Sequence, residues 1–136
     1  MDGTVGGGGH AAAILRASTP TGQLFGCDRD GTAVAAAAQR LAEFAGRCVL
    51  RQANFAELRD WVEPASCDGV LMDLGVSSPQ LDWPERGFSL QADGPLDMRM
   101  DPHHGMSAAQ WLARADAAEI ARVLREHGDE RFAASI

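Results

Sequence analysis

Three features are absent from this sequence: a long apolar run, a signal peptide and a cysteine pattern typical of disulfides or metal sites. Each absence excludes a class of protein. No apolar run approaches the roughly 20 residues that a membrane-spanning helix needs. The first residues, Met-Asp-Gly-Thr, lack the basic and apolar regions of a signal peptide. The three cysteines, Cys27, Cys48 and Cys67, are odd in number and widely spaced, which argues against a disulfide framework and a CxxC metal site. We therefore expect no membrane segment and a reduced, cytoplasmic location.

Lysine is absent as well. All twelve basic residues are arginines, and the net charge is −7. Phosphate contacts supply most of the affinity of a protein for nucleic acid, so this composition counts against an RNA-binding surface unless that surface lies on residues outside the chain. The apolar content of 46% is nevertheless sufficient for the buried core of one domain.

The first half of the chain alternates between strand and helix patterns, which predicts an α/β fold with a parallel sheet. We expect strands at 23–27, 48–52 and 69–74, and helices at 11–17, 32–45 and 55–62. In the first helix, Ile14 and Leu15 should face inward. In the second helix, a stripe at helical spacing should face the core, formed by Ala33, Ala37, Leu41 and Phe44.

The segment 75–106 shows neither period and is rich in Gly, Pro, Ser and Asp. A structureless loop of this length is uncommon in a compact domain and is usually functional or disordered. We expect an ordered loop because it carries large apolar anchors, namely Trp83, Phe88, Leu96, Met98 and Met100.

Two helices should follow this loop, with capping boxes formed by Ser107 with Gln110 and by Asp116 with Glu119. The second helix should present one face, Ile120, Val123, Leu124 and His127, and should stop at Gly128.

A glycine-rich loop, Gly6 to Gly9, precedes the first expected helix. Glycines allow positive φ and let a ligand approach the backbone, and the helix N-terminus behind them offers free amide groups. In an alternating strand–helix chain, nucleotides and related cofactors bind at such a turn. Four glycines in a mobile tail would give the same pattern, so the loop is a weak signal on its own.

Two carboxylates strengthen this signal. Asp28 lies about twenty residues after the loop, at the end of the next expected strand, where an acidic side chain accepts hydrogen bonds from ribose hydroxyls. Asp73 lies at the end of the strand expected at 69–74, so both should reach the same edge of the sheet. Phe55 follows the intervening strand and could lie against an adenine ring, although core packing explains it equally well.

The residues alone do not identify the cofactor. Gly6-x-Gly8-x-x-Ala11 also fits the dinucleotide fingerprint, so a nicotinamide-dinucleotide-binding oxidoreductase is an alternative. There is no GxxxxGK[ST] phosphate-binding loop. His103 and His104 have no third ligand at metal-binding spacing, and we expect no metal site.

Several strings resemble the ribosomal RNA small subunit methyltransferase H family. The most specific are Asp73-Leu-Gly-Val-Ser-Ser-Pro-Gln-Leu-Asp82 and Gly94-Pro-Leu-Asp-Met-Arg-Met-Asp101. The others are Asp2-Gly-Thr-Val-Gly-Gly-Gly-Gly-His10, Asp28-Arg-Asp30, Asn54-Phe55, Glu85-Arg-Gly-Phe-Ser89 and Gly128-Asp-Glu-Arg-Phe132. The resemblance covers nearly the whole chain.

The resemblance implies a class I S-adenosylmethionine-dependent methyltransferase sheet, Rossmann-like, with an inserted helical domain. The implied activity is methyl transfer from S-adenosyl-L-methionine to N4 of a cytidine in 16S ribosomal RNA of the small ribosomal subunit. The implied cofactor-binding residues are Gly8, Gly9, His10, Asp28, Phe55, Asp73 and Gln80. A candidate active-site loop contains Asp73, Ser77, Ser78 and Pro79; no general base is identified.

By this resemblance, residues 1–82 form part of a cofactor-binding domain, 83–106 an ordered linker loop, and 107–136 the beginning of the inserted helical domain. Compared with the family, the chain lacks the segment before the glycine loop and the later strands. We therefore expect a chain truncated at both ends, with little or no activity by itself. A non-catalytic binding fragment is the remaining alternative.

Overall fold

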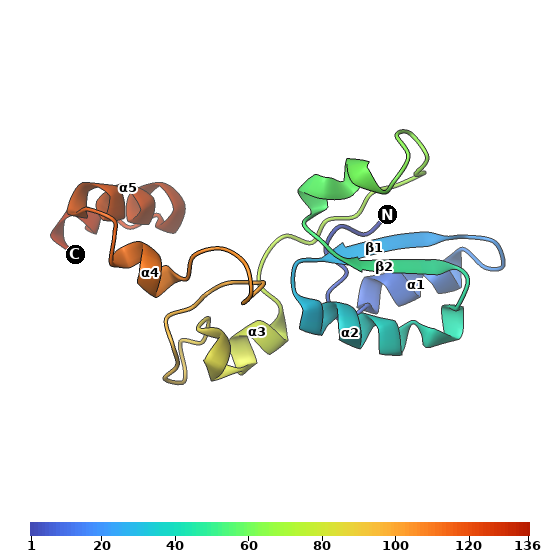
Figure 1. The fold of residues 1–136 in the computed structure, drawn as a ribbon, viewed down its shortest axis with the longest axis horizontal. Coiled ribbons are helices and arrows are strands. Elements are labelled where there is room, and N and C mark those ends of the chain that lie inside the picture. The colour runs from blue at the N-terminus through green and yellow to red at the C-terminus, as the bar shows by residue number, and fades with distance from the viewer. The chain divides into compact units, whose positions relative to one another are not determined.

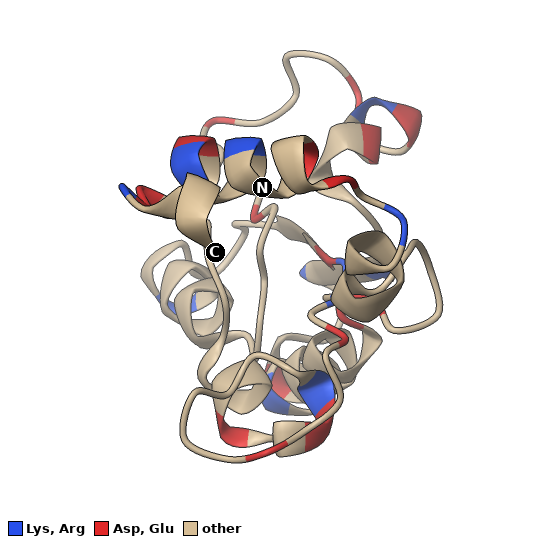
Figure 2. Ribbon diagram, turned by 90° about the vertical axis from the view of Figure 1, so that its left-hand side faces the viewer, with Lys and Arg blue, Asp and Glu red and all other residues tan.

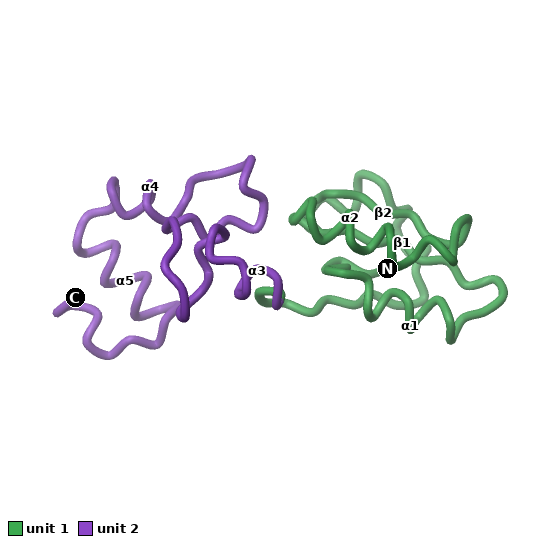
Figure 3. The backbone as a smooth tube through the Cα atoms, turned by 90° about the horizontal axis from the view of Figure 1, so that it is seen from below, with its two compact units in different colours: residues 1–77 green, residues 78–136 purple.

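The computed structural model describes all residues, 1–136. The chain forms two compact units, which we call unit 1 (Met1–Ser77) and unit 2 (Ser78–Ile136) (Figures 1 and 3). Because their relative position is not determined, each unit is described by itself.

Unit 1 is built on a small parallel sheet. Strands β1 (Leu24–Asp28) and β2 (Cys48–Gln52) pair in parallel, with Leu24 opposite Cys48 and Asp28 opposite Gln52. The N-terminal residues extend this sheet, because Asp2 forms parallel bridges to Gly26 on one side and to Leu71 on the other. The N-terminal segment therefore lies in the middle, with β1 and β2 on one side and residues around Leu71 on the other. The order of the parallel segments therefore reverses at the N-terminal segment.

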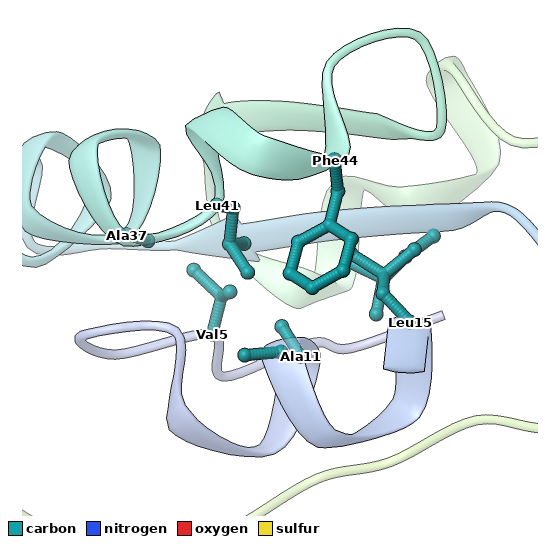
Figure 4. Close-up of a cluster of buried hydrophobic side chains, with 8 residues drawn as sticks. Val5, Ala11, Leu15, Ala37, Leu41 and Phe44 are labelled. Carbon is teal, nitrogen blue, oxygen red and sulfur yellow. The ribbon is translucent and has the colours of Figure 1, made fainter. Parts of the chain in front are cut away.

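Helices α1 (Gly9–Ala17) and α2 (Gly31–Arg40) both pack against β1, and α2 also contacts β2. The Asp30 carboxylate starts α2 by accepting a hydrogen bond from the amide of Thr32 at 3.0 Å, a typical N-cap. Between the helices and the sheet lies the core of unit 1, shown in Figure 4. It consists of Val5, Ala11, Ala12, Leu15, Leu24, Ala37, Leu41 and Phe44. Burial of these side chains is the main source of stability in unit 1.

The alternating fold expected in the first half is confirmed, with several corrections. The strand at 48–52 is as expected, and the first strand begins and ends one residue later than predicted. The helix expected at 32–45 ends at Arg40 and continues as a 3₁₀ turn, η1 (Ala42–Phe44), although Ala37, Leu41 and Phe44 are buried as predicted and Ala33 is half-buried. The helix expected at 55–62 is a 3₁₀ helix, η2 (Phe55–Asp60).

Two expectations for unit 1 are wrong. The strand predicted at 69–74 is a single bridge at Leu71, because only the short segment Met1–Gly3 pairs with it and its outer edge has no partner strand. Ile14 does not face the core with Leu15: it is 37% exposed. Ala11 and Leu15 are one helical turn apart and define the buried face of α1, so Ile14 lies on its flank.

Unit 2 consists of short helices joined by a long, hydrogen-bonded loop. Its helices are α3 (Ser78–Asp82), η3 (Pro84–Arg86), α4 (Ala108–Leu112), α5 (Ala117–Gly128) and η4 (Ala133–Ser135). Within the loop, the Arg86 guanidinium donates to the carbonyls of Arg99 and Met100, and the Asp97 carboxylate binds the guanidinium of Arg99 at 2.6 Å. The amides of Ala108 and Ala109 donate to the carbonyls of Asp97 and Leu96. The loop is thus ordered by polar contacts.

The expected anchors of this loop need correction. Trp83, Leu96 and Met98 are exposed, and only Phe88 and Met100 are half-buried. The loop also contains α3 and η3, which the sequence pattern did not predict. Apolar anchoring therefore contributes less to its order than the hydrogen bonds around Arg86 and Asp97.

The helix caps of unit 2 follow the sequence closely. Ser107 and Gln110 form the reciprocal capping box that the sequence predicted. Asp116 caps α5 by accepting from the amide of Glu119 at 2.8 Å, but the Glu119 carboxylate binds the Arg122 guanidinium, so the second box is only half formed. Gly128 is the last residue of α5, and the stop is Asp129, in the left-handed region at φ 52°. No helix of the structure is long and apolar enough to span a membrane.

Candidate functional site

The glycine loop lies where the central N-terminal segment meets α1. Gly6 and Gly8 have positive φ, 50° and 80°, and Gly8 directly precedes the first helical residue, Gly9. A Cβ atom on Gly8 would lie 3.2 Å from the Cα of Ala37 in α2. Glycine is therefore required at Gly8 both by conformation and by the close packing of the two helices.

The residues after Gly8 form an open helix start. Gly9 and His10 are exposed, and no side chain caps the N-terminus of α1. The first amides of a helix have no partner within it, and the helix dipole makes this end partly positive. The first turn of α1 can therefore donate hydrogen bonds to a ligand seated on the loop.

Asp28 ties the end of β1 to this loop. Its Oδ2 accepts a hydrogen bond from the Gly6 amide at 2.9 Å, and its Oδ1 accepts from the Asp30 amide at 3.0 Å. The structure thus brings together the two features that the sequence paired across 22 residues. Each carboxylate oxygen offers about two lone-pair sites, so both can accept a further hydrogen bond from a hydroxyl.

Phe55 follows β2 and lies near the N-terminal segment. A Cβ on Gly3 would be 3.3 Å from the Cβ of Phe55, so glycine at position 3 permits this close approach. The Phe55 side chain is 36% exposed and is not part of the core cluster. The contact of the Phe55 ring with an adenine therefore stays a prediction.

Asp73 reaches the same edge of the sheet through a contact that sequence reasoning missed. Its amide donates a 2.7 Å hydrogen bond to the Thr4 hydroxyl, which joins the segment after Leu71 to the start of the glycine loop. The Asp73 side chain is exposed. Because these segments run parallel, Thr4, Asp28 and Asp73 all lie at their carboxyl ends, where open α/β sheets bind ligands. In the sequence, the one hint of this contact is that Thr4 stands between Asp2 and Gly6, directly before the glycine loop.

Asp2 is a second residue that sequence reasoning missed. It is only 1% exposed; its Oδ1 accepts a 3.1 Å hydrogen bond from the Thr4 amide, and its buried Oδ2 makes none. Burial raises the pKa of Asp2 above its ordinary 3.8. The neighbouring Cys27 is fully buried, and burial with the Asp28 and Asp2 carboxylates raises the pKa of its thiol to about 11. Cys27 is therefore a packing residue rather than a nucleophile.

The remaining predicted site residues fall at the boundary between the units. Asp73 and Ser77 belong to unit 1, whereas Ser78, Pro79 and Gln80 lie in α3 of unit 2, where the Gln80 side chain is buried. The placement of Gln80 beside the cofactor therefore stays a prediction.

His103 and His104 both contact Asp101. The Asp101 carboxylate accepts a hydrogen bond from the His103 amide and lies 2.7 Å from the His104 ring. No group of three or more potential ligands is placed to hold a metal ion.

Comparison with known proteins adds two findings. The model of the MraW methylase family matches residues 1–136. The ribosomal RNA small subunit methyltransferase H of Xylella fastidiosa (strain M12) is 55% identical over 131 residues, which are 96% of this chain and 42% of that protein.

Proteins with the same name in Thioalkalivibrio sulfidiphilus and Syntrophotalea carbinolica are 53% and 51% identical over 140 and 139 residues. Each match covers 100% of this chain and 44% of the relative. The chain therefore spans less than half the length of these curated relatives.

Proposed function

Because the chain belongs to the MraW methylase family, we propose that it forms the cofactor-binding part of a class I, S-adenosylmethionine-dependent methyltransferase. The proposed acceptor is N4 of a cytidine in 16S ribosomal RNA, since the relatives are named ribosomal RNA small subunit methyltransferases. Family membership favours S-adenosyl-L-methionine over the nicotinamide dinucleotide that the glycine pattern alone allowed.

The observation that carries this proposal is the hydrogen bond between the Gly6 amide and the Asp28 carboxylate, 22 residues apart. It fixes a carboxylate beside a glycine loop and an open helix start, an arrangement that suits a nucleoside. Asp28 would hold the ribose hydroxyls, Gly8, Gly9 and His10 would line the loop, and Phe55 would flank the adenine. Asp73 and Gln80 would complete the pocket. The uncapped start of α1, the exposed Gly9 and His10 and the Asp28 carboxylate beside Gly6 are hydrogen-bonding groups of the kind that a nucleoside needs, so the residues present fit this cofactor.

Bound S-adenosyl-L-methionine supplies an electrophilic methyl group on a positively charged sulfur. Carboxylates at the carboxyl edge, Asp28 and Asp73, would favour a cationic ligand there. The chain's main task is to hold the attacking nitrogen, the methyl carbon and the sulfur in line. The loop containing Asp73, Ser77, Ser78 and Pro79 would receive the exocyclic amine, which must come from an unpaired or flipped cytosine.

We assign residues 1–82 to the cofactor-binding domain, 83–106 to the linker loop and 107–136 to the start of a helical domain. Both units are acidic: unit 1 has six arginines and nine carboxylates, and unit 2 has six and ten. Basic and acidic residues are interspersed along the ribbon (Figure 2). The 16S RNA partner is therefore proposed from the family and not from charge.

The test is cofactor binding by the full chain, measured by isothermal titration and thermal shift with S-adenosyl-L-methionine, S-adenosyl-L-homocysteine and NAD. We expect the first two to bind and raise the melting temperature, because a ligand of the folded state stabilises it, and NAD to have no effect. Asp28→Asn should weaken binding of S-adenosyl-L-homocysteine by about tenfold, as loss of a charged hydrogen bond does.

The matched control is Asp68→Asn, an exposed carboxylate next to Gly69, which begins the segment that pairs with the N-terminus. It lies at the opposite end of the parallel segments from Asp28 and should bind like the parent chain. Equal losses in both variants, or binding of NAD alone, would contradict the proposal.

A further inference from the structure

The N-terminal segment of unit 1 has an irregular hydrogen-bond pattern at Thr4. In a regular parallel ladder, the bonds of one strand recur at every second residue. Asp2 follows this pattern, because its amide donates to the Phe25 carbonyl and its carbonyl accepts from the Cys27 amide. The next donor to the Cys27 carbonyl should be the Thr4 amide, but it is the Val5 amide, at 2.9 Å. Thr4 is thus an extra residue in the ladder, which defines a β-bulge.

The bulge also changes the pairing on the other side of the segment. The Gly3 amide donates to the Leu71 carbonyl, so a regular ladder would continue with a bond from the Asp73 amide to the Gly3 carbonyl. Instead, the Gly3 carbonyl accepts from the Cys27 thiol at 3.6 Å. The Asp73 amide donates to the Thr4 hydroxyl at 2.7 Å. The Thr4 side chain therefore replaces a main-chain acceptor at the point where the segment reaches Asp73.

Asp2 stabilises this bulge from within the sheet. The Thr4 amide, which the bulge removes from the ladder, donates to Oδ1 of Asp2 at 3.1 Å. The Asp2 side chain is buried, and its Oδ2 has no hydrogen-bond partner. Burial of a carboxylate with an unpartnered oxygen is unfavourable, and the single group that this carboxylate satisfies is the bulged amide. Asp2 therefore holds the backbone of Thr4 where its hydroxyl reaches Asp73.

The bond from Asp73 to Thr4 determines where Asp73 lies. It is the only hydrogen bond between residues 72–76 and the N-terminal segment. The side chains of Leu74 and Val76 are exposed, so packing there does little to fix the segment. Gly75, two residues after Asp73, has a φ of 149°, a conformation that other residues rarely adopt. The position of Asp73 therefore depends on the Thr4 hydroxyl.

We propose that Thr4, set in the bulge by Asp2, is the positioning residue that fixes the Asp73 carboxylate for cofactor binding. The proposal rests on the proposed function, in which Asp73 completes the cofactor pocket. Bulges beside active sites re-aim a side chain, and here the re-aimed side chain is that of Thr4. Thr4 acts through the backbone of Asp73, so its role is distinct from contact with the cofactor.

The experiment compares Thr4→Val with Thr4→Ser in the full chain. Valine has nearly the shape of threonine but offers no acceptor, whereas serine keeps the hydroxyl. Isothermal titration at a temperature well below the melting transition measures affinity for S-adenosyl-L-homocysteine. We expect Thr4→Val to weaken binding about five- to tenfold, the size of one lost hydrogen bond, and Thr4→Ser to restore it to within about twofold. Thr21→Val is the matched control at an exposed threonine before β1, and should bind like the parent chain.

A double-mutant cycle distinguishes positioning from a general structural role. If Thr4 acts through Asp73, the loss caused by Thr4→Val should shrink in an Asp73→Asn background, because the carboxylate that it positions is no longer there. A merely structural role would give the same fold-change in both backgrounds. Hydrogen exchange of the Asp73 amide supplies a second readout, in which protection should be lost with Thr4→Val and kept with Thr4→Ser.

Three results would overturn the proposal: parental affinity in Thr4→Val, equal losses in the two backgrounds, or an Asp73 amide that stays protected without the hydroxyl. Thr4→Ala replaces the valine variant in each measurement if that variant does not fold. Absence of cofactor binding by the parent chain would refute the proposed function by itself. The exchange of the Asp73 amide would then still decide whether Thr4 holds this segment.

Discussion

Unit 1 and unit 2 maintain their structures by different means. Nine of the ten buried hydrophobic residues lie in unit 1, and only Ala133 lies in unit 2. Unit 2 instead relies on helix caps, on the Arg86 and Asp97 contacts of its loop and on exposed ion pairs along α5. Apolar burial is the larger contribution to folding, and isolated polar contacts contribute little net free energy. Unit 1 should therefore be the more stable part of the chain.

This difference bears on the proposed site. The glycine loop, Asp28 and Thr4 are held by hydrogen bonds from backbone amides to side-chain oxygens next to a packed core, so this edge is preorganised for a ligand. The loop of unit 2, by contrast, carries apolar residues that are mostly exposed. Local stability follows buried apolar contacts, so this part should open more readily.

The largest expected effect comes from the core of unit 1. Leu15→Ala should lower the free energy of unfolding of unit 1 by about 2–5 kcal/mol, because it deletes a fully buried side chain and leaves a cavity. Ile14→Ala, on the exposed flank of the same helix, should cost well under half as much. Residue-resolved hydrogen exchange would measure both, and equal effects would show that α1 does not pack as described.

A smaller effect is expected at the glycine loop. Gly8→Ala should destabilise unit 1 by about 1–2 kcal/mol through the left-handed conformation, with more from the approach to Ala37. Gly7→Ala should be nearly neutral for stability, because a Cβ there meets no atom within 4 Å. Denaturant unfolding compares the two variants, and a Gly7 variant as unstable as the Gly8 variant would contradict the loop geometry.

In unit 2 the expected effect is of the size of one helix cap. Asp116→Ala removes the acceptor for the Glu119 amide and should cost about 1 kcal/mol, seen as loss of exchange protection in α5. Glu126→Ala removes only an exposed ion pair with Arg122 and should change protection less. Neither variant should alter protection in unit 1 if the units are stabilised separately.

The smallest effects should have opposite pH dependence in the two units. The raised pKa of Asp2 means that the folded state binds this proton more tightly than the unfolded state. Its contribution to stability therefore grows as pH falls through the raised value toward about 3.8. The hydrogen bond from Arg99 lowers the pKa of Asp97 below 3.8, so its contribution is present above that pH and is lost as pH falls through the folded pKa.

Asn substitutions separate these contributions. Asp97→Asn should reduce protection of the unit 2 loop at pH 7 by a few tenths of a kcal/mol, with the difference vanishing in acid. Asp2→Asn should increase protection of unit 1 at pH 7, with the gain shrinking toward pH 4. Hydrogen exchange at a series of pH values would detect either trend, and parallel trends in both units would contradict the assignment.

The sequence predicted the local features that depend on nearby residues. The strand at Cys48–Gln52, the buried positions Ala37, Leu41 and Phe44, and the capping box of Ser107 and Gln110 all follow from periodicity or from spacing within one helical turn. The pairing of Gly6 with Asp28 was also predictable, because strand ends in a parallel sheet meet at one edge. The predicted role of Gln80 remains a prediction.

Only the tertiary structure decided the features that depend on which surfaces meet. Whether Ile14 or Leu15 is buried depends on the direction from which the sheet approaches α1, which hydrophobicity does not encode. Asp2 is identified as a buried, partly unsatisfied carboxylate, and Thr4 as the partner of Asp73, only because segments about 70 residues apart in sequence become neighbours at Leu71. Sequence patterns report on contacts along one element, whereas the pairing of distant segments is set by the packing of the whole fold.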